Sequence, residues 1–236
     1  MFVDPRGGHN RKSINNNFFK KWSPEMAYIL GLISADGAVE DVRRSSRTCY
    51  FTITSKDKTL ISQARKALQS THKIYERKER LQKFNNGTYL CAKNFILRVG
   101  NKKMIQDLIN LGLIPRKSLR LRLPEMPTEH FEFFTRGYFD GDGCVHVSVR
   151  KGSRKPKISV IFTSGSKKFL GNLSIKLQEN LNISLNRVYY NSGAFRLKYR
   201  EENSLKILSF MYKNLYKAPY LNRKYQIYQN YLKSLN

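Results

Sequence analysis

The stretch AYILGLISADG at residues 27–37 decides the fold, because a second stretch of the same kind, FTRGYFDGDG, follows at residues 134–143. Each stretch reads as an apolar helix that runs into a small residue, an aspartate and a glycine. Glycine readily takes the left-handed backbone conformation that ends helices, so we expect each helix to stop at its final Asp-Gly pair. The sequence therefore predicts two repeats of about a hundred residues each.

Small residues within these helices predict how the two repeats meet. Gly31 and Ala35 lie four positions apart in the first stretch, and Gly137 and Gly141 do so in the second. Residues four apart share one helix face, and small side chains let two helix backbones approach closely. We expect the two helices to pack against each other with their C-terminal ends together.

Packing of this kind would make Asp36 and Asp142 close neighbours. Two adjacent carboxylates repel each other, and the negative C-terminal ends of the helices add to the repulsion. Divalent cations relieve such a conflict, and Mg²⁺ prefers hard oxygen ligands. Paired aspartates around metal ions are suited to hydrolysis of a phosphodiester. A single apolar helix before Asp-Gly is usually only a buried helix and a turn, but two copies in a strongly basic chain favour the metal site.

At residues 29–37 and 135–143 the chain resembles the two LAGLIDADG motifs of a single-chain homing endonuclease, and the resemblance covers most of the chain. It implies that Asp36 and Asp142 bind catalytic Mg²⁺ ions, at sites that Mn²⁺ or Ca²⁺ could also occupy. It also implies that Ala35 and Gly141 offer backbone carbonyl oxygens to these metals. The chain departs from the motif at positions that we interpret as tolerant, which are Ser34, Thr135, Arg136 and Tyr138.

The same resemblance implies a catalytic role for two lysines. In this family a lysine after the third helix of each repeat often stabilises the charge that develops at the scissile phosphate. Lys117 and Lys224 lie at comparable places, and each directly follows an arginine. The expected catalytic residues are therefore Asp36, Asp142, Lys117 and Lys224.

The predicted fold class is α+β, with two pseudo-symmetric repeats in the order α-β-β-α-β-β-α. We expect a basic N-terminal arm at 1–22, a first repeat at 23–112, a proline-bounded linker at 113–127 and a second repeat at 128–236. The resemblance implies saddle-shaped antiparallel sheets over DNA, with the helices behind them and the motif helices at the repeat interface. The expected helices are 23–36, 56–70, 101–111, 128–142, 167–181, 202–215 and 221–235, and the expected strands are 37–44, 47–54, 73–81, 88–99, 145–150, 157–163, 184–190 and 194–200.

The chain is strongly basic, with 44 Lys and Arg residues against 17 Asp and Glu residues and a net charge of +27. A surplus of this size indicates a polyanionic partner. Nucleic acid is favoured over a membrane, because basic residues spread along the whole chain and no apolar run approaches the roughly 18 residues of a membrane span. The three cysteines lack CxxC spacing and are typical of a reducing compartment. We expect an intracellular protein, in a bacterial cytoplasm or an organelle matrix.

Strand alternation predicts which side chains meet DNA. Along residues 194–200 apolar and basic side chains alternate, so one face of this strand packs on the core and the other is basic. A two-stranded ribbon fits the major groove, where arginine pairs with guanine edges. For each candidate the alternative is a merely solvated basic face. The expected DNA contacts are Arg44, Thr52, Lys73, Arg77, Arg98, Arg150, Lys157, Arg196 and Lys198.

These features predict a site-specific endonuclease that cuts both strands of double-stranded DNA with divalent metals. Because the two repeats differ in sequence, each should read a different half-site, so the target is long and asymmetric. We expect a monomer that needs no protein partner. Two other functions stay open on the same fold: an RNA-binding maturase that assists intron splicing, and a DNA-binding regulator that does not cleave. Loss of cleavage usually shows as a missing motif aspartate, and both aspartates are present.

Overall fold

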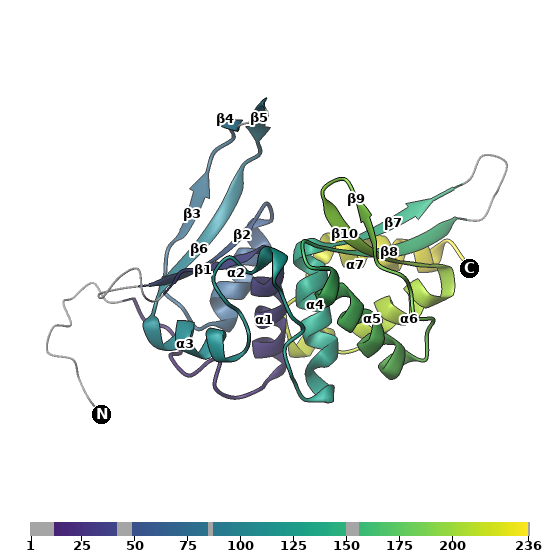
Figure 1. Cartoon of the computed structure of the whole chain (residues 1–236), viewed down its shortest axis with the longest axis horizontal. Coiled ribbons are helices and arrows are strands. Elements are labelled where there is room, and N and C mark those ends of the chain that lie inside the picture. Colours follow the sequence, from purple (N-terminus) through teal and green to yellow (C-terminus); the bar gives the residue numbers. More distant parts are fainter. Residues whose placement is uncertain (1–11, 42–48, 85–86, 150–155, 236) are drawn as a thin grey trace, which may run out of the picture.

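The computed structural model describes residues 12–41, 49–84, 87–149 and 156–235. Helices α1 (Pro24–Asp36) and α4 (Phe131–Asp142) lie side by side at the centre of the molecule (Figure 1). The other helices and the strands are arranged on either side of this pair, one set in each repeat. The predicted α+β class, with two repeats and the motif helices at their interface, is confirmed.

The two central helices touch through their backbones. A Cβ atom on Gly31 would lie 2.8 Å from the backbone nitrogen of Tyr138, and one on Gly137 would overlap the carbonyl oxygen of Tyr28. Residues 26–34 of α1 are all buried. A helix that is buried on every side belongs to the interior of the molecule, so α1 and α4 form the core that the two repeats share.

The start of α1 follows from its sequence. The hydroxyl oxygen of Ser23 accepts a hydrogen bond of 3.1 Å from the N–H of Met26. Pro24 occupies the first helical position, where a backbone N–H would have no partner within the helix. The helix therefore begins where the sequence predicts it.

The glycines that end the two central helices do so differently from our expectation. Gly37 has φ −98° and Gly143 has φ −95°, so neither takes the left-handed conformation. Both leave the helix directly in extended backbone. A Cβ atom on Gly37 would lie 2.6 Å from the Ile33 carbonyl oxygen, and one on Gly143 would collide with the ring of Phe139. Glycine is required here by the lack of space rather than by the sign of φ.

Each repeat carries one antiparallel four-stranded sheet. In the first repeat the order is β1-β2-β6-β3, and in the second it is β7-β8-β10-β9. Buried side chains of β2, such as Phe51 and Ile53, and of β6, such as Leu97, face the helices. The strands are β1 (Gly37–Val39), β2 (Tyr50–Ser55), β3 (Ile74–Arg77), β6 (Asn94–Gly100), β7 (Gly143–Ser148), β8 (Lys157–Ser164), β9 (Tyr189–Asn191) and β10 (Ala194–Arg200).

Helices cover one side of the sheets in both repeats, and the strands lie together on the other side of the molecule (Figure 1). The described α-helices beyond the central pair are α2 (Lys58–Ala67), α3 (Lys102–Asn110), α5 (Lys167–Leu181), α6 (Glu201–Tyr212) and α7 (Asn222–Lys233). Short 3₁₀ turns lie at η2 (Lys117–Leu119), η3 (Thr128–His130) and η4 (Leu215–Lys217). Within the described ranges, no helix combines the length and the apolar character that crossing a membrane requires.

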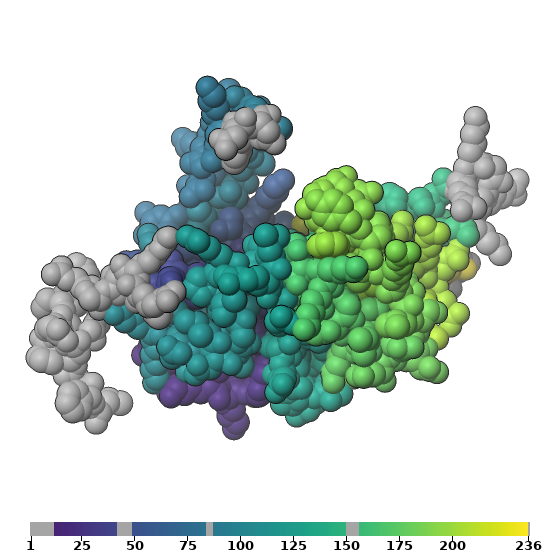
Figure 2. Space-filling view, viewed as in Figure 1, coloured from purple at the N-terminus to yellow at the C-terminus, as the bar shows by residue number. Residues whose placement is uncertain are grey.

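The second hairpin of the first repeat is longer and more divided than we predicted. Strands β4 (Arg80–Phe84) and β5 (Gly87–Cys91) form a separate two-stranded ribbon beyond β3 and β6. Figure 2 shows this ribbon rising from the first repeat, with a notch between it and the second repeat. The side chains of Leu81 and Leu90 in this ribbon are exposed.

The matching hairpin of the second repeat is shorter than we predicted. We expected a strand at 184–190, but residues 183–188 are irregular and the strand covers only Tyr189–Asn191. The side chain of Asn186 donates a hydrogen bond of 2.7 Å to the Lys198 carbonyl, and its own N–H donates to the Ser174 hydroxyl. These side-chain hydrogen bonds replace the regular strand ladder.

The N-terminal segment is anchored from residue 12 onward in the part that the structure describes. Phe18 and Phe19 are buried in the core of the first repeat. The N–H of Ser13 donates a hydrogen bond of 2.8 Å to the Thr71 hydroxyl. Residues 1–11 lie outside the described residues, so the arm that we expect at 1–22 stays a prediction, as do the other domain boundaries.

Gly137→Ala should destabilise the protein strongly, because the new methyl group would overlap the Tyr28 carbonyl and force the central helices apart. We expect a loss of about 3 kcal/mol in unfolding free energy, the upper end for overpacking. Urea unfolding followed by circular dichroism measures it. Gly171→Ala in α5 is the matched control, because nothing lies within 4 Å of its Cβ position. This control should gain about 0.5 to 1 kcal/mol from helix propensity. Equal effects of the two changes would contradict the packing.

Candidate active site and nucleic-acid interface

The C-terminal ends of the central helices bring Asp36 and Asp142 together. A Cβ atom on Gly141 would lie 3.3 Å from Oδ2 of Asp36 and would overlap the Cβ atom of Ala35. The side chain of Asp36 is exposed and that of Asp142 is half-buried, so solvent reaches both. The small residues therefore let the two helix ends approach closely, and this approach places two solvent-accessible carboxylates side by side.

Electrostatic repulsion is concentrated at this place. Although solvent reaches Asp36, many protein atoms surround it, and this desolvation together with the charge of Asp142 raises its pKa to about 6. Desolvation also raises the pKa of Asp142. The negative ends of α1 and α4 add to the field. The site therefore favours a bound positive charge.

Two buried lysines already supply part of that positive charge. Nζ of Lys117 donates a hydrogen bond of 3.3 Å to the Ala35 carbonyl, at the end of α1. Nζ of Lys224 donates to the carbonyls of Gly143, at 2.6 Å, and of Phe139, at the end of α4. Burial lowers the pKa of Lys117 and lowers that of Lys224 to about 8. Both lysines thus lie near the aspartates, and their catalytic role stays a prediction.

The segments that carry the two lysines each contact the opposite repeat. The hydroxyl of Ser166, in the second repeat, donates a hydrogen bond of 2.8 Å to the carbonyl of Leu121, which follows the first lysine. Arg223, beside the second lysine, forms an ion pair of 2.9 Å with Asp57 of the first repeat. Each half of the site is therefore supported by both repeats.

The residues at this place fit a divalent metal. The donors are hard carboxylate and carbonyl oxygens, which suit Mg²⁺. Gly141 lets the end of α1 approach the end of α4 closely, because a Cβ there would overlap the Cβ atom of Ala35 beside Asp36. Within the described ranges no cluster of three or more His, Cys, Asp or Glu side chains forms a metal cage, so the two carboxylates would need further oxygen ligands from backbone, water or a phosphate. The roles of Asp36, Asp142, Ala35 and Gly141 as ligands stay predictions.

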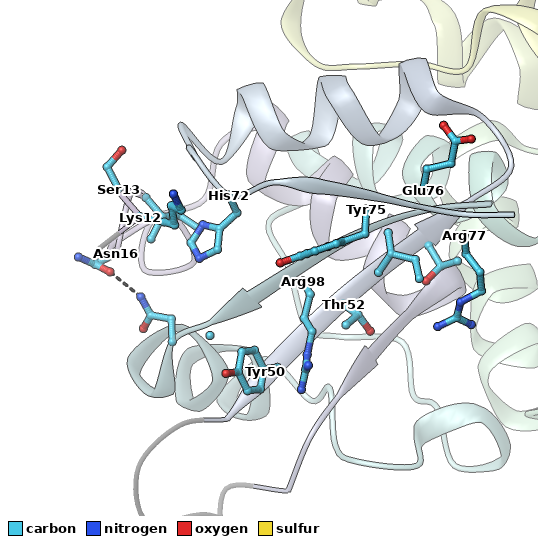
Figure 3. A pocket seen from close by; sticks show the side chains of 15 residues that line it. Lys12, Ser13, Asn16, Tyr50, Thr52, His72, Tyr75, Glu76, Arg77 and Arg98 are labelled. Carbon is cyan, nitrogen blue, oxygen red and sulfur yellow. Dashed lines mark hydrogen bonds between the residues drawn. The ribbon is translucent and has the colours of Figure 1, made fainter. Parts of the chain in front are cut away.

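The sheet of the first repeat is hollowed on the face away from its helices. The hollow has a volume of about 1550 Å³ and is lined by side chains of β2, β3 and β6. Among the predicted DNA contacts, Thr52, Arg77 and Arg98 lie in it (Figure 3). The guanidinium of Arg98 lies 3.7 Å above the ring of Tyr50. Lys73 is exposed directly before β3 and lies outside this lining.

The sheet of the second repeat carries the other predicted contacts. Lys157 and Lys198 line a smaller hollow of about 290 Å³. Lys157 is paired with Glu201. Arg196 is half-buried on β10, opposite Thr163. Two predicted contacts, Arg44 and Arg150, lie outside the described residues.

Sequence reasoning missed three buried charged residues on α4, which are Glu132, Arg136 and Asp140. We interpreted Arg136 as a tolerant position, but it is fully buried, and its guanidinium donates hydrogen bonds to the carbonyls of Met211, at 2.8 Å, and Ala218, at 2.9 Å. Asp140 is buried one turn later on the same helix face. The available signal was a series of charged residues at four-residue steps inside an otherwise apolar stretch.

Comparisons with known proteins agree with this architecture. The profile of the LAGLIDADG-like domain family matches residues 23–111 and 132–209, which is more than half of the chain. No curated protein matches the chain.

Solved structures of LAGLIDADG endonucleases share the fold over most of the chain. The I-LtrWI homing endonuclease bound to target DNA is 15% identical, with a TM-score of 0.57 over 94% of this chain and 91% of that one. The homing endonuclease I-WcaI bound to its DNA recognition sequence is 16% identical, with a TM-score of 0.55 over 93% of this chain and 95% of that one. I-SmaMI, bound to an uncleaved DNA target in the presence of calcium ions, is 13% identical, with a TM-score of 0.53 over 91% of each chain. At these identities the likeness shows the fold.

Asp36→Asn should stabilise the metal-free protein at about pH 8, because it removes one of two repelling charges. The folded-state pKa of Asp36, about 6, exceeds its ordinary value of 3.8. The folded protein therefore holds this proton more tightly than the unfolded chain does, and wild-type stability falls as pH rises between these two values. The gain from Asp36→Asn should vanish at about pH 4, where the wild-type side chain is protonated. Melting temperatures in EDTA across this range measure the effect, and a gain that is independent of pH would contradict it.

Proposed function

The chain belongs to the LAGLIDADG-like domain family, and from that premise we propose that it is a site-specific endonuclease that hydrolyses both strands of double-stranded DNA. The observation that carries the proposal is the pair of accessible carboxylates, Asp36 and Asp142, at the junction of two sheets with basic side chains. A surface charge that favours a polyanion beside a centre that favours cations supports the binding and cutting of a phosphodiester.

Each residue of the centre has a chemical task in this reaction. Asp36 and Asp142 would hold Mg²⁺, and the carbonyls of Ala35 and Gly141 would offer it further oxygen ligands. The metal, when bound, lowers the pKa of an attacking water and neutralises charge on the leaving oxygen. Lys117 and Lys224, buried next to the carboxylates, stabilise the negative charge that develops on each scissile phosphate. The low dielectric around the lysines strengthens this interaction.

The two repeats support recognition of a long, asymmetric target. The first repeat offers the large hollow and the projecting β4–β5 ribbon, and the second offers a smaller hollow and a short β9–β10 hairpin. Because both repeats lie in one chain, a monomer can place two different surfaces on two half-sites. We propose that DNA lies along both sheets and that the protein works inside the cell, where such DNA is found.

The experiment starts from a randomised duplex library, because the target sequence is unknown. DNA that the protein retains in Ca²⁺ is selected, sequenced and then incubated with Mg²⁺ or with EDTA. We expect double-strand cleavage in Mg²⁺ and none in EDTA. Asp36→Asn and Asp142→Asn should still bind the selected DNA while cleavage falls by at least about a hundredfold. Glu179→Gln, on the exposed face of α5, is the matched control and should cut normally.

The outcomes separate the proposal from its alternatives. Specific DNA binding without cleavage by the wild-type protein would indicate a regulator. Tighter binding to structured RNA than to any selected DNA would indicate a maturase. Intact cutting of both strands by Asp36→Asn would remove the proposed mechanism.

Lys198→Ala should weaken DNA binding and flatten its dependence on salt, because the lysine lies on the proposed DNA face of β10. For a phosphate contact, the slope of log K against log salt should fall in magnitude by about one. Fluorescence anisotropy of a labelled selected duplex over a series of KCl concentrations measures it. Lys206→Ala, on α6 behind the sheet, should leave the slope unchanged. Equal slopes for both variants would place the DNA elsewhere.

A further inference from the structure

Asp140 is a buried acid that the proposed reaction does not use. Its side chain is 2% exposed. One of its oxygens, Oδ2, accepts two hydrogen bonds of 2.8 Å, from the hydroxyl of Tyr28 and from the backbone N–H of Leu221. Burial of a carboxylate costs free energy unless hydrogen bonds replace its lost hydration. Loss of either bond would leave this oxygen poorly solvated, so the carboxylate keeps both the hydroxyl and the N–H in place.

These two partners come from distant parts of the chain. Tyr28 belongs to α1 in the first repeat, and Leu221 is the residue that precedes the first turn of α7. Lys224 lies in that first turn. An anchored Leu221 therefore fixes where α7 begins, and with it the direction from which Lys224 reaches the aspartates. Nζ of Lys224 in turn donates a hydrogen bond of 3.0 Å to the carbonyl of Asp140.

Arg136 holds the same segment from the same helix face. It lies one turn before Asp140 and binds the carbonyls of Met211 and Ala218. Asp140 binds the N–H of Leu221. A positive and a negative side chain of α4 thus bind complementary backbone groups of the segment 211–221. This segment is the connection that delivers Lys224.

The first repeat has no such arrangement among its described residues. Ser34 stands at the position that matches Asp140, and its hydroxyl donates a hydrogen bond of 2.7 Å to Leu30 within α1 itself. Among the residues that the structure describes, Lys117 donates to one carbonyl, that of Ala35 at 3.3 Å, whereas Lys224 donates to three. The two lysines of the site are therefore supported unequally.

We propose that Asp140 is a positioning residue that holds Lys224, and not Lys117, beside the paired aspartates by fixing the start of α7. The proposal rests on the proposed function, because it says that the hydrogen bonds of Asp140 support one half of the nuclease centre. It accounts for an aspartate in the second motif where the first motif carries serine. It also implies that the two DNA strands are cut by halves of unequal rigidity.

The first test needs neither DNA nor metal. Reductive methylation with formaldehyde and a borane, followed by mass spectrometry, measures the accessibility of each lysine. In wild-type protein Lys117 and Lys224 should both react slowly, since they are 5% and 3% exposed. Asp140→Leu removes the acceptor while keeping the branched four-atom skeleton of the side chain, and it should speed methylation of Lys224 by on the order of tenfold, with Lys117 unchanged. Ser34→Ala is the matched control and should change neither lysine.

Two milder variants keep the test decisive if Asp140→Leu folds poorly. Asp140→Asn retains an oxygen that can accept both hydrogen bonds and should keep Lys224 protected. Tyr28→Phe removes one of the two bonds and should expose Lys224 to a smaller extent, again without effect on Lys117. Unchanged reactivity of Lys224 in both Asp140→Leu and Tyr28→Phe would overturn the proposal. Equal gains for both lysines would also overturn it, because the effect would then be general loosening.

The second test reads the two strands of a selected target separately. With each strand labelled in turn, Asp140→Leu should change the ratio of the two nicking rates by on the order of tenfold, because misplacement of one catalytic group affects one half of the site. Ser34→Ala should leave the ratio at the wild-type value. An equal slowing of both strands would overturn the role in positioning. If the wild-type protein cuts neither strand, the proposed function fails, and lysine reactivity still decides what Asp140 does.

Discussion

Backbone contact between α1 and α4 is the constraint on which the rest of this structure depends. Gly31 and Gly137 have no room for a side chain, because each faces the main chain of the other helix. The close contact continues to the C-terminal ends of the two helices, where Gly141 lies against Ala35. Asp36 and Asp142 therefore form one site rather than two. The same contact makes a common core for both repeats. Stability and the geometry of the site therefore depend on the same few glycines.

This close approach carries an electrostatic cost, and the structure offsets it with buried lysines. Two carboxylates and two negative helix ends meet in one place. Desolvation, together with the charge of Asp142, raises the pKa of Asp36 to about 6. Lys117 and Lys224 bind the carbonyls of these helix ends. The segment of each lysine is held by a residue of the opposite repeat, Ser166 in one case and Asp57 in the other. Each half of the centre is therefore in contact with both repeats.

The two repeats are alike in order but unlike in the surfaces that they present. The first extends its sheet into the β4–β5 ribbon, and the second replaces part of the matching strand with irregular backbone held by Asn186. The motif helices differ in the same way, because Asp140 binds distant backbone and Ser34 binds only its own helix. Pseudo-symmetry fixes the common centre, and these departures from it give each half its own shape and support.

The sequence by itself determined the repeats, most of the element order and the meeting of the motif helices, because hydrophobic periodicity, Ser23 as a cap and small residues four apart are local signals. It also singled out Asp36 and Asp142, since a repeated acid is visible without coordinates. Only the tertiary structure decided the roles of Arg136 and Asp140. Their partners are backbone groups far along the chain, and a backbone N–H or carbonyl leaves no mark in a sequence. Tertiary packing also decided how the two glycines end the motif helices. They are needed because a side chain would have no space there, and neither takes the left-handed conformation that local rules predict.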